Sequence, residues 1–179
     1  MCKTIVRYLR RKSIEKNTAK KRRHHAVLNL SQPLTIGVLI EDGAPHIDDI
    51  RKEICRLFNT MHCLFFIFDA KSDKTGGMDK VGCFVGRHDL NVFGLLNEAG
   101  RNNIGSVPVD MLIDVAKEQP DGLLLKDYLV SQIKSAWKVS FASKYNELFD
   151  IVIAPKEKSD IAEKIGDLHR YLSMLYGNR

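Results

Sequence analysis

The sequence has few cysteines, and their spacing is not that of a metal site. Four occur in 179 residues, at Cys2, Cys55, Cys63 and Cys83, and no two form the C-x-x-C pair typical of zinc-binding proteins. Cys55 and Cys63 lie in apolar segments, where a free thiol behaves as a small hydrophobic side chain. We therefore expect no metal site, and reduced thiols as in a reducing compartment.

Long hydrophobic runs are also absent. The longest spans residues 63–68, whereas a helix needs about 20 apolar residues to cross a bilayer. Near the N-terminus Arg7 interrupts the apolar residues, so this segment does not have the pattern of a secretory signal. These absences favour a cytoplasmic protein without a transmembrane segment.

The composition is otherwise ordinary. Hydrophobic residues make up 44% of the chain and charged residues 28%, which is typical of a soluble globular protein. A chain of 179 residues is most simply one domain with an appendage. We expect a basic N-terminal arm and linker at residues 1–33 and an α/β domain at residues 34–179.

Positive charge is concentrated at one end of the chain. Residues 1–25 carry ten Lys and Arg but one acid, Glu15, whereas residues 26–179 carry 18 basic and 21 acidic side chains. The formal net charge of +6 therefore belongs to the arm and not to the body. Apolar residues at helical spacing favour a short helix over residues 5–16, while the cations of residues 20–23 repel one another and favour an extended chain.

A strand, a helix and a second strand are predicted at the start of the body. The apolar runs at residues 34–40 and 62–69 each predict a buried strand. Between them, apolar residues recur every three or four positions over residues 47–61, as in an amphipathic helix. The three elements predict a βαβ unit with parallel strands and a right-handed crossover.

The next segment is less regular. Residues 71–80 are a polar loop, and residues 81–85 predict a short strand. We expect this strand to pair antiparallel, because its connection is too short for a helical crossover. Residues 90–96 indicate one or two helical turns, and residues 97–107 have the composition of a surface loop.

Regular patterns return in the last third of the chain. They predict a strand at residues 109–115, a helix at 125–133, two strands at 137–141 and 150–153 joined at hairpin length, and a helix at 161–175 that Ser159 caps. The elements together predict an α/β fold: a single mixed, mostly parallel sheet of five or six strands flanked by helices, as a three-layer sandwich, with a basic N-terminal helix or arm.

The order of several segments is similar to that of a known family. These segments are TIGVLIED, the stretch Asp-Leu-Asn-x-Phe-Gly at residues 89–94, VDMLIDV, FDIVIAP and the final helix. The chain resembles an uncharacterised Bacteroidetes family of small α/β proteins with a basic N-terminal segment, which is known only as a domain of unknown function. The resemblance implies an α/β fold and a bacterial cytoplasm, and it implies no activity, cofactor or catalytic residue.

The basic arm is the first candidate site. Lysines and arginines that neutralise phosphates release counterions, which gives salt-sensitive binding with little sequence preference. The predicted polyanion-binding residues are Arg7, Arg10, Arg11, Lys12, Lys16, Lys20, Lys21, Arg22 and Arg23. Alternatives are an anionic membrane surface, a solvated arm that aids solubility, or an arm that docks on acidic body residues such as Asp48, Asp49 and Glu53.

The second candidate is a set of acids where predicted strands end, Asp42, Asp69 and Asp114. Parallel strands bring their carboxyl ends to one edge of a sheet, where ligands of open α/β sheets bind. Carboxylates there can hold Mg²⁺ or act as acid and base. The alternative is that each aspartate caps the turn that follows it.

Two weaker motifs carry less weight. Gly76 and Gly77 with nearby lysines do not match a phosphate-binding loop. His88 and Asp89 beside Cys83 would suit a Cys–His nucleophile, but nothing in the sequence brings them to a cleft.

The functional hypothesis that follows is a cytoplasmic binding protein, without demonstrable catalysis, whose basic arm contacts RNA, DNA or a ribosome-like surface. One alternative is a small-ligand or nucleotide-binding enzyme that uses the strand-end carboxylates. Another is an assembly protein, such as a homo-oligomer, whose arm docks on a neighbouring subunit. No cofactor is indicated.

Overall fold

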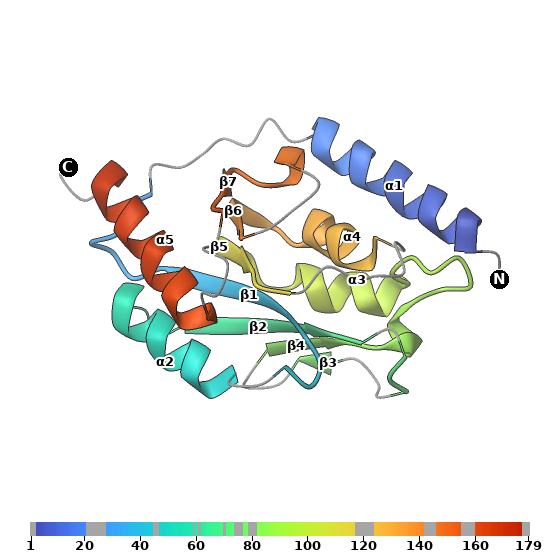
Figure 1. Ribbon diagram of the computed structural model, residues 1–179. Helices are drawn as coiled ribbons and strands as arrows, with labels where there is room; N and C mark the ends of the chain where they lie inside the picture. Colours follow the sequence, from blue (N-terminus) through green and yellow to red (C-terminus); the bar gives the residue numbers. More distant parts are fainter. Residues whose placement is uncertain are drawn as a thin grey trace.

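The computed structural model describes residues 3–20, 28–44, 47–58, 60, 62–69, 71–73, 77–78, 82–116, 124–141, 146–154 and 160–176, to which all structural statements refer. One sheet forms the centre of the molecule (Figure 1). Its strands are β1 (Thr35–Glu41), β2 (His62–Phe68), β3 (Gly77–Met78), β4 (Gly82–Val85), β5 (Val109–Asp114), β6 (Ser135–Ser140) and β7 (Ile151–Val152). They lie in the order β3-β4-β2-β1-β5-β6-β7, and of the described strands only β3 runs antiparallel to its neighbour. The predicted α/β fold with a mixed, mostly parallel sheet is confirmed.

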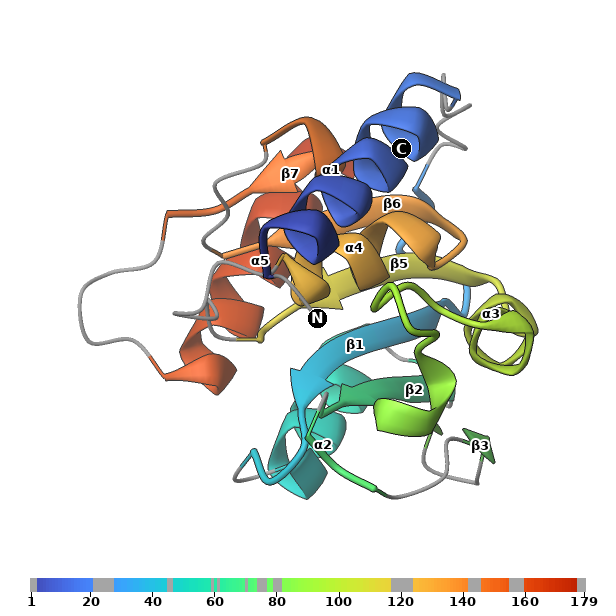
Figure 2. The same cartoon turned by 90° about the vertical axis from the view of Figure 1, so that its right-hand side faces the viewer.

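Helices cover both faces of this sheet. The longer ones are α1 (Lys3–Lys20), α2 (Ile47–Phe58), α3 (Glu98–Gly105), α4 (Leu125–Gln132) and α5 (Ile161–Tyr176). Two hydrophobic clusters fill the space between the layers. One lies between the sheet and helices α2 and α5, and the other lies between the sheet and helices α3 and α4. α1 lies on the outer side of α4, away from the sheet (Figure 2). The N-terminal helix is therefore packed on the body as an additional layer.

β1 shows why the central strands are apolar on both sides. Side chains alternate between the two faces of a strand, so a strand with helices on both faces needs apolar residues at every position. Val38 and Ile40 pack toward α2 and α5, whereas Leu39 packs toward α3 and α4. The predicted βαβ unit is confirmed, since β1 pairs parallel with β2 from Thr35–His62 to Glu41–Phe68.

Two predictions of strand direction were wrong. β4 pairs parallel with β2, and β7 pairs parallel with β6, although both connections had the length of a hairpin. A parallel connection without a helix is possible here because each new strand is short: β4 has four residues and β7 has two. The connecting chain therefore runs back only a short distance along the sheet before the next strand begins. Asp150 also fixes the start of β7, since its carboxylate accepts the Lys138 amide at 2.7 Å and its own amide donates to the Lys138 carbonyl at 2.8 Å.

Two local predictions in residues 90–107 were also wrong. Residues 90–96 do not form a helical turn; they form a tight loop closed by a bridge between Leu90 and Leu96. The predicted surface loop is instead helix α3, where the Asn97 side chain accepts the Gly100 amide at 2.9 Å. Gly100 is needed for packing, because a Cβ there would lie 2.7 Å from the Asp89 carbonyl oxygen. The glycines and asparagines that resemble a loop serve a capped and closely packed helix.

The remaining elements agree with the periodicity. α4 and α5 occupy the predicted positions, α2 ends at Phe58, before the predicted Met61, and β6 begins at Ser135. The predicted cap Ser159 lies outside the described residues. None of the described helices is long and apolar enough to cross a membrane.

Candidate functional site

α1 is anchored through a stripe of side chains one helical turn apart. Val6, Arg10 and Ile14 are buried, with 7%, 3% and 4% of their surface exposed. Arg10 Nε donates a hydrogen bond to the Gly94 carbonyl at 2.9 Å. Gly94 has a φ of +70°, and a Cβ there would lie 2.9 Å from Val6 Cγ1, so a residue without a side chain suits this contact.

The second half of α1 makes polar contacts with the end of α4. The Asn17 amide group donates to the Ser131 carbonyl and hydroxyl, each at 3.4 Å. Gln132 Nε2 donates to Ser13 Oγ at 3.3 Å. Apolar burial and side-chain hydrogen bonds together give α1 a defined orientation on the body.

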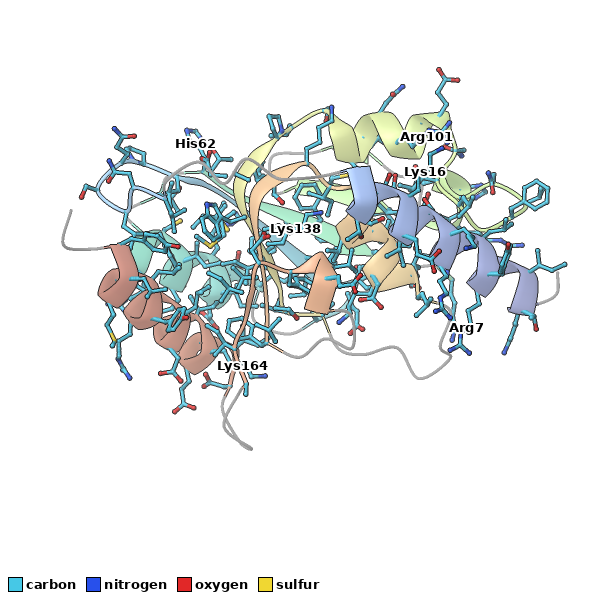
Figure 3. The ribbon with its side chains drawn as sticks, turned by 90° about the horizontal axis from the view of Figure 1, so that it is seen from above. Arg7, Lys16, His62, Arg101, Lys138 and Lys164 are labelled. Atoms are coloured by element: carbon cyan, nitrogen blue, oxygen red, sulfur yellow. The ribbon has the colours of Figure 1, made fainter. Side chains whose placement is uncertain are left out.

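The opposite side of α1 is basic and faces solvent. Its exposed cations include Arg7, Arg11, Lys12 and Lys16. Arg7 and Lys16 are nine residues apart, about two and a half helical turns, so they project from opposite flanks (Figure 3). In the described part of the chain, neither has an ion-pair partner.

Glu15 neutralises only part of this charge. Its carboxylate accepts Arg11 Nε at 3.2 Å and Lys12 Nζ at 2.9 Å. The hydrogen bond between Lys12 and Glu15 raises the pKa of the lysine and lowers the pKa of the glutamate. All three side chains are largely exposed, so solvent screens these pairs and the helix surface keeps a positive balance.

The structure changes the set of arm residues that can meet a polyanion. Arg10 faces the body and is bonded to Gly94, so it is not accessible to a phosphate. The Lys20 side chain and residues 21–23 lie outside what the structure describes.

The acids Asp48, Asp49 and Glu53 do not receive the arm helix. All three lie on α2, whereas α1 packs on α4 at the other face of the sheet. Asp49 Oδ1 is 3.8 Å from Lys52 Nζ, and Glu53 Oε1 is 2.6 Å from Arg56 Nη2, so two of these acids have cationic partners on their own helix.

The three strand-end aspartates share one edge of the sheet but differ in environment. Strands β2, β1 and β5 are neighbours and parallel, so Asp69, Asp42 and Asp114 follow or end strands at the same carboxyl edge. Asp42 is exposed, and Asp69 Oδ1 accepts the Lys71 amide at 2.8 Å, as in a turn cap. Among the described residues, no three His, Cys, Asp or Glu side chains are grouped so as to hold a metal ion.

Asp114 is buried in an ion pair with Lys126 of α4. Its Oδ2 lies 3.1 Å from Lys126 Nζ, and the two side chains are 1% and 6% exposed. Oδ1 accepts the Ala116 amide at 3.1 Å, and Ser140 Oγ lies 3.5 Å from Oδ2. Burial raises the pKa of Asp114 to about 6, although Lys126 opposes the shift.

This ion pair lies close to the topological switch point of the sheet. β1 leads to α2 on one face, whereas β5 leads to α4 on the other face. Ligands of open α/β sheets bind between two such strand ends. Residues 45–46 and 117–123 lie outside the described residues.

The sequence motif around Cys83 does not form a nucleophile site. Cys83 is buried, and burial raises the pKa of its thiol to about 12, so the thiolate is not available at neutral pH. His88 is exposed, while the Asp89 carboxylate accepts the Gly86 amide at 2.8 Å. Gly77 begins strand β3, and Gly76 lies outside the described residues.

Sequence reasoning missed a hollow between α3 and the end of α4, the α3–α4 hollow. It measures about 490 Å³ and is lined by Arg101, Asn102, Gly105, Ser106, Gln132 and Lys134. No sequence signal marks it, because its two cations are isolated in the chain and strand β5 and helix α4 lie between them. The fold brings them to one surface.

Comparison with known protein families places most of the chain in one family model. Residues 7–175 match DUF6913, a family of unknown function. No curated protein and no solved structure matches the chain.

Proposed function

Because this chain belongs to the DUF6913 family, which has no established function, we propose a function from its own surface: it is a binding protein whose basic N-terminal helix contacts the phosphate backbone of a nucleic acid. The observation that carries this proposal is the two-sided character of α1. Val6, Arg10 and Ile14 fix the helix to the body, and the outward side presents cations to solvent.

A helix that is already docked suits this role for a physical reason. A disordered basic arm must lose conformational entropy when it binds, which weakens the complex. Contacts through Arg7, Arg11 and Lys16 would be made by a helix that the body has already ordered. Each phosphate neutralised would release counterions, so binding would weaken as salt rises.

The proposal includes little sequence preference. Tyr8 is the one aromatic residue of α1, and a single ring does not make a platform on which successive bases stack. We assign the contact to residues 1–33 and the scaffold to residues 34–179. A bacterial cytoplasm is the compartment that fits this ligand, and no catalytic step is required of the protein.

The test is binding of a fluorescein-labelled 20-nucleotide RNA, followed by anisotropy at several salt concentrations. One variant combines Arg7→Gln, Arg11→Gln and Lys16→Gln. Its control removes the same charge from exposed positions on α2 and α5, with Lys52→Gln, Arg56→Gln and Arg170→Gln. We expect the α1 variant to lose affinity and to reduce the slope of log K against log salt by about two, while the control keeps the wild-type slope.

Three results would reject the proposal. The first is that the wild-type chain fails to bind RNA even at low salt. The second is that the two triple variants bind RNA equally well. The third is strong binding to phosphatidylserine vesicles without RNA binding, which would make α1 a membrane-surface helix instead.

A second candidate function is a small-ligand enzyme at the switch point. The observation that favours it is Asp114, a buried carboxyl with a pKa of about 6 beside a buried lysine, near the edge where such sheets bind ligands. Thermal-shift measurements with nucleotides test it. A nucleotide that stabilises the wild type and not Asp114→Asn supports this candidate, and no shift with any nucleotide removes its basis.

A further inference from the structure

The α3–α4 hollow has the chemistry of an anion site. Arg101 and Lys134 supply positive charge from its two walls, and Asn102 supplies an amide group. The Ser106 hydroxyl donates to the Asn103 carbonyl, and Gln132 Nε2 donates to Ser13 and Ser131, so these two residues shape the hollow. None of the six lining residues is acidic. Arg101 is held in place, since its Nη1 donates to the Leu96 carbonyl at 2.8 Å, and the guanidinium keeps further donors.

The hollow lies next to the basic helix. Gln132, which lines it, donates to Ser13 of α1, and Lys16 follows Ser13 by one helical turn. Seen from above, Lys16 lies on the flank of α1 toward α3, where Arg101 also lies, and Arg7 lies on the other flank (Figure 3). A chain of phosphates that contacts this flank of α1 therefore has a second cationic point of attachment beside it.

We propose that the α3–α4 hollow holds one phosphate group, with its sugar, of the nucleic acid strand that α1 contacts. This inference rests on the proposed function and adds a defined anchor to it. A volume of about 490 Å³ accommodates a sugar-phosphate unit. No aromatic side chain lines the hollow, so the anchor recognises the backbone and not the base.

Gly105 allows a matched test of the charge requirement. Nothing lies within 4 Å of the position that a Cβ would take there, so a side chain fits without displacing a neighbour. Gly105→Asp adds a carboxylate to the hollow, and Gly105→Asn adds a group of the same shape without charge. We expect Gly105→Asp to bind the labelled 20-nucleotide RNA about tenfold more weakly than Gly105→Asn at low salt, because like charges repel at this range.

Lys134→Gln is the second probe and does not depend on Gly105. Lys134 is exposed, so its substitution removes one cation without opening the core. The expected effect is a reduction of about 0.7 in the slope of log K against log salt, as for one lost phosphate contact with a single strand. Lys52→Gln on α2 is the control and leaves the slope unchanged.

The outcomes separate this inference from the proposed function. If the α1 triple variant weakens binding while Gly105→Asp equals Gly105→Asn and Lys134→Gln keeps the slope, the hollow is not an anchor but α1 still binds. If the wild type fails to bind RNA, both proposals fall. Equal melting temperatures of Gly105→Asp and Gly105→Asn show that a difference in affinity comes from charge and not from folding.

Discussion

At the scale of single residues, Asp114 makes stability depend on pH. Its folded-state pKa of about 6 lies above the value of about 3.9 for an unfolded aspartate. The unfolded chain therefore gives up this proton at lower pH than the folded chain does. It follows that the contribution of Asp114 is fully present below pH 4 and declines as the pH rises toward 6.

We predict that Asp114→Asn removes this pH dependence. The free energy of unfolding of the wild type should contain a decline of up to about 3 kcal/mol between pH 4 and 6 that the variant lacks. Urea denaturation at several pH values measures it. Asp42→Asn is the control, since Asp42 is exposed at the same sheet edge. Parallel profiles for the wild type and Asp114→Asn would contradict the burial argument.

The reverse variant, Lys126→Met, leaves the Asp114 carboxylate buried without its cation. Removing one partner of a buried ion pair costs about 3–5 kcal/mol, whereas replacing both by neutral groups of similar size is nearly neutral. We expect Lys126→Met to be strongly destabilised at pH 7, and Lys126→Met with Asp114→Asn to recover most of the loss. A double variant no more stable than Lys126→Met alone would show that the aspartate charge is not the source of the cost.

At the scale of elements, the docking of α1 depends on its apolar stripe. We predict that Ile14→Ala lowers the free energy of unfolding by about 2–4 kcal/mol, because it removes a buried side chain and leaves a cavity. Ile5→Ala is the matched control: Ile5 is 51% exposed, and its loss should cost less than about 0.5 kcal/mol. Equal effects in chemical denaturation would mean that α1 does not pack on α4 in solution.

Elements were predictable from sequence where burial is one-sided or complete. The apolar spacing of α2 and α5 and the continuous apolar strands β1 and β2 follow directly from the layers that they form. α3 was missed because its signal lies in tertiary contacts: Gly100 is selected by the nearby Asp89 backbone, which the local sequence does not reveal. The directions of β4 and β7 were missed because connection length is a weak guide when strands are very short.

The candidate site was predictable only in part for a similar reason. The excess of cations in the arm can be counted along the sequence without knowledge of the fold, so the basic surface of α1 could be predicted. Which cations face solvent depends on the helix phase relative to α4, and that phase places Arg10 inside. The ion pair of Asp114 with Lys126 arises from the crossover between β5 and β6, which contains α4. The same crossover brings Lys134 to the hollow that Arg101 of α3 also lines.

At the scale of the whole molecule, α1 belongs to the folded unit. We predict that a chain beginning at residue 28 has a lower melting temperature than the full chain and binds the dye ANS, since α4 then loses the helix that covers it. A full-length Arg7→Gln variant is the control, because it changes charge without uncovering α4. An unchanged melting temperature on truncation would mean that α1 adds no stability.

The interior position of α4 has a consequence for how this protein can change over generations. Residues 125–131 are all buried, so α4 has the sheet beneath it and α1 above it. A tail that is merely tethered can be lost or exchanged by recombination without harm to the domain behind it. Here a replacement for α1 would need the same buried residues that pack on the body, Val6, Arg10 and Ile14. Substitutions in α1 are therefore expected to depend on those in α4, a helix more than a hundred positions further along the chain.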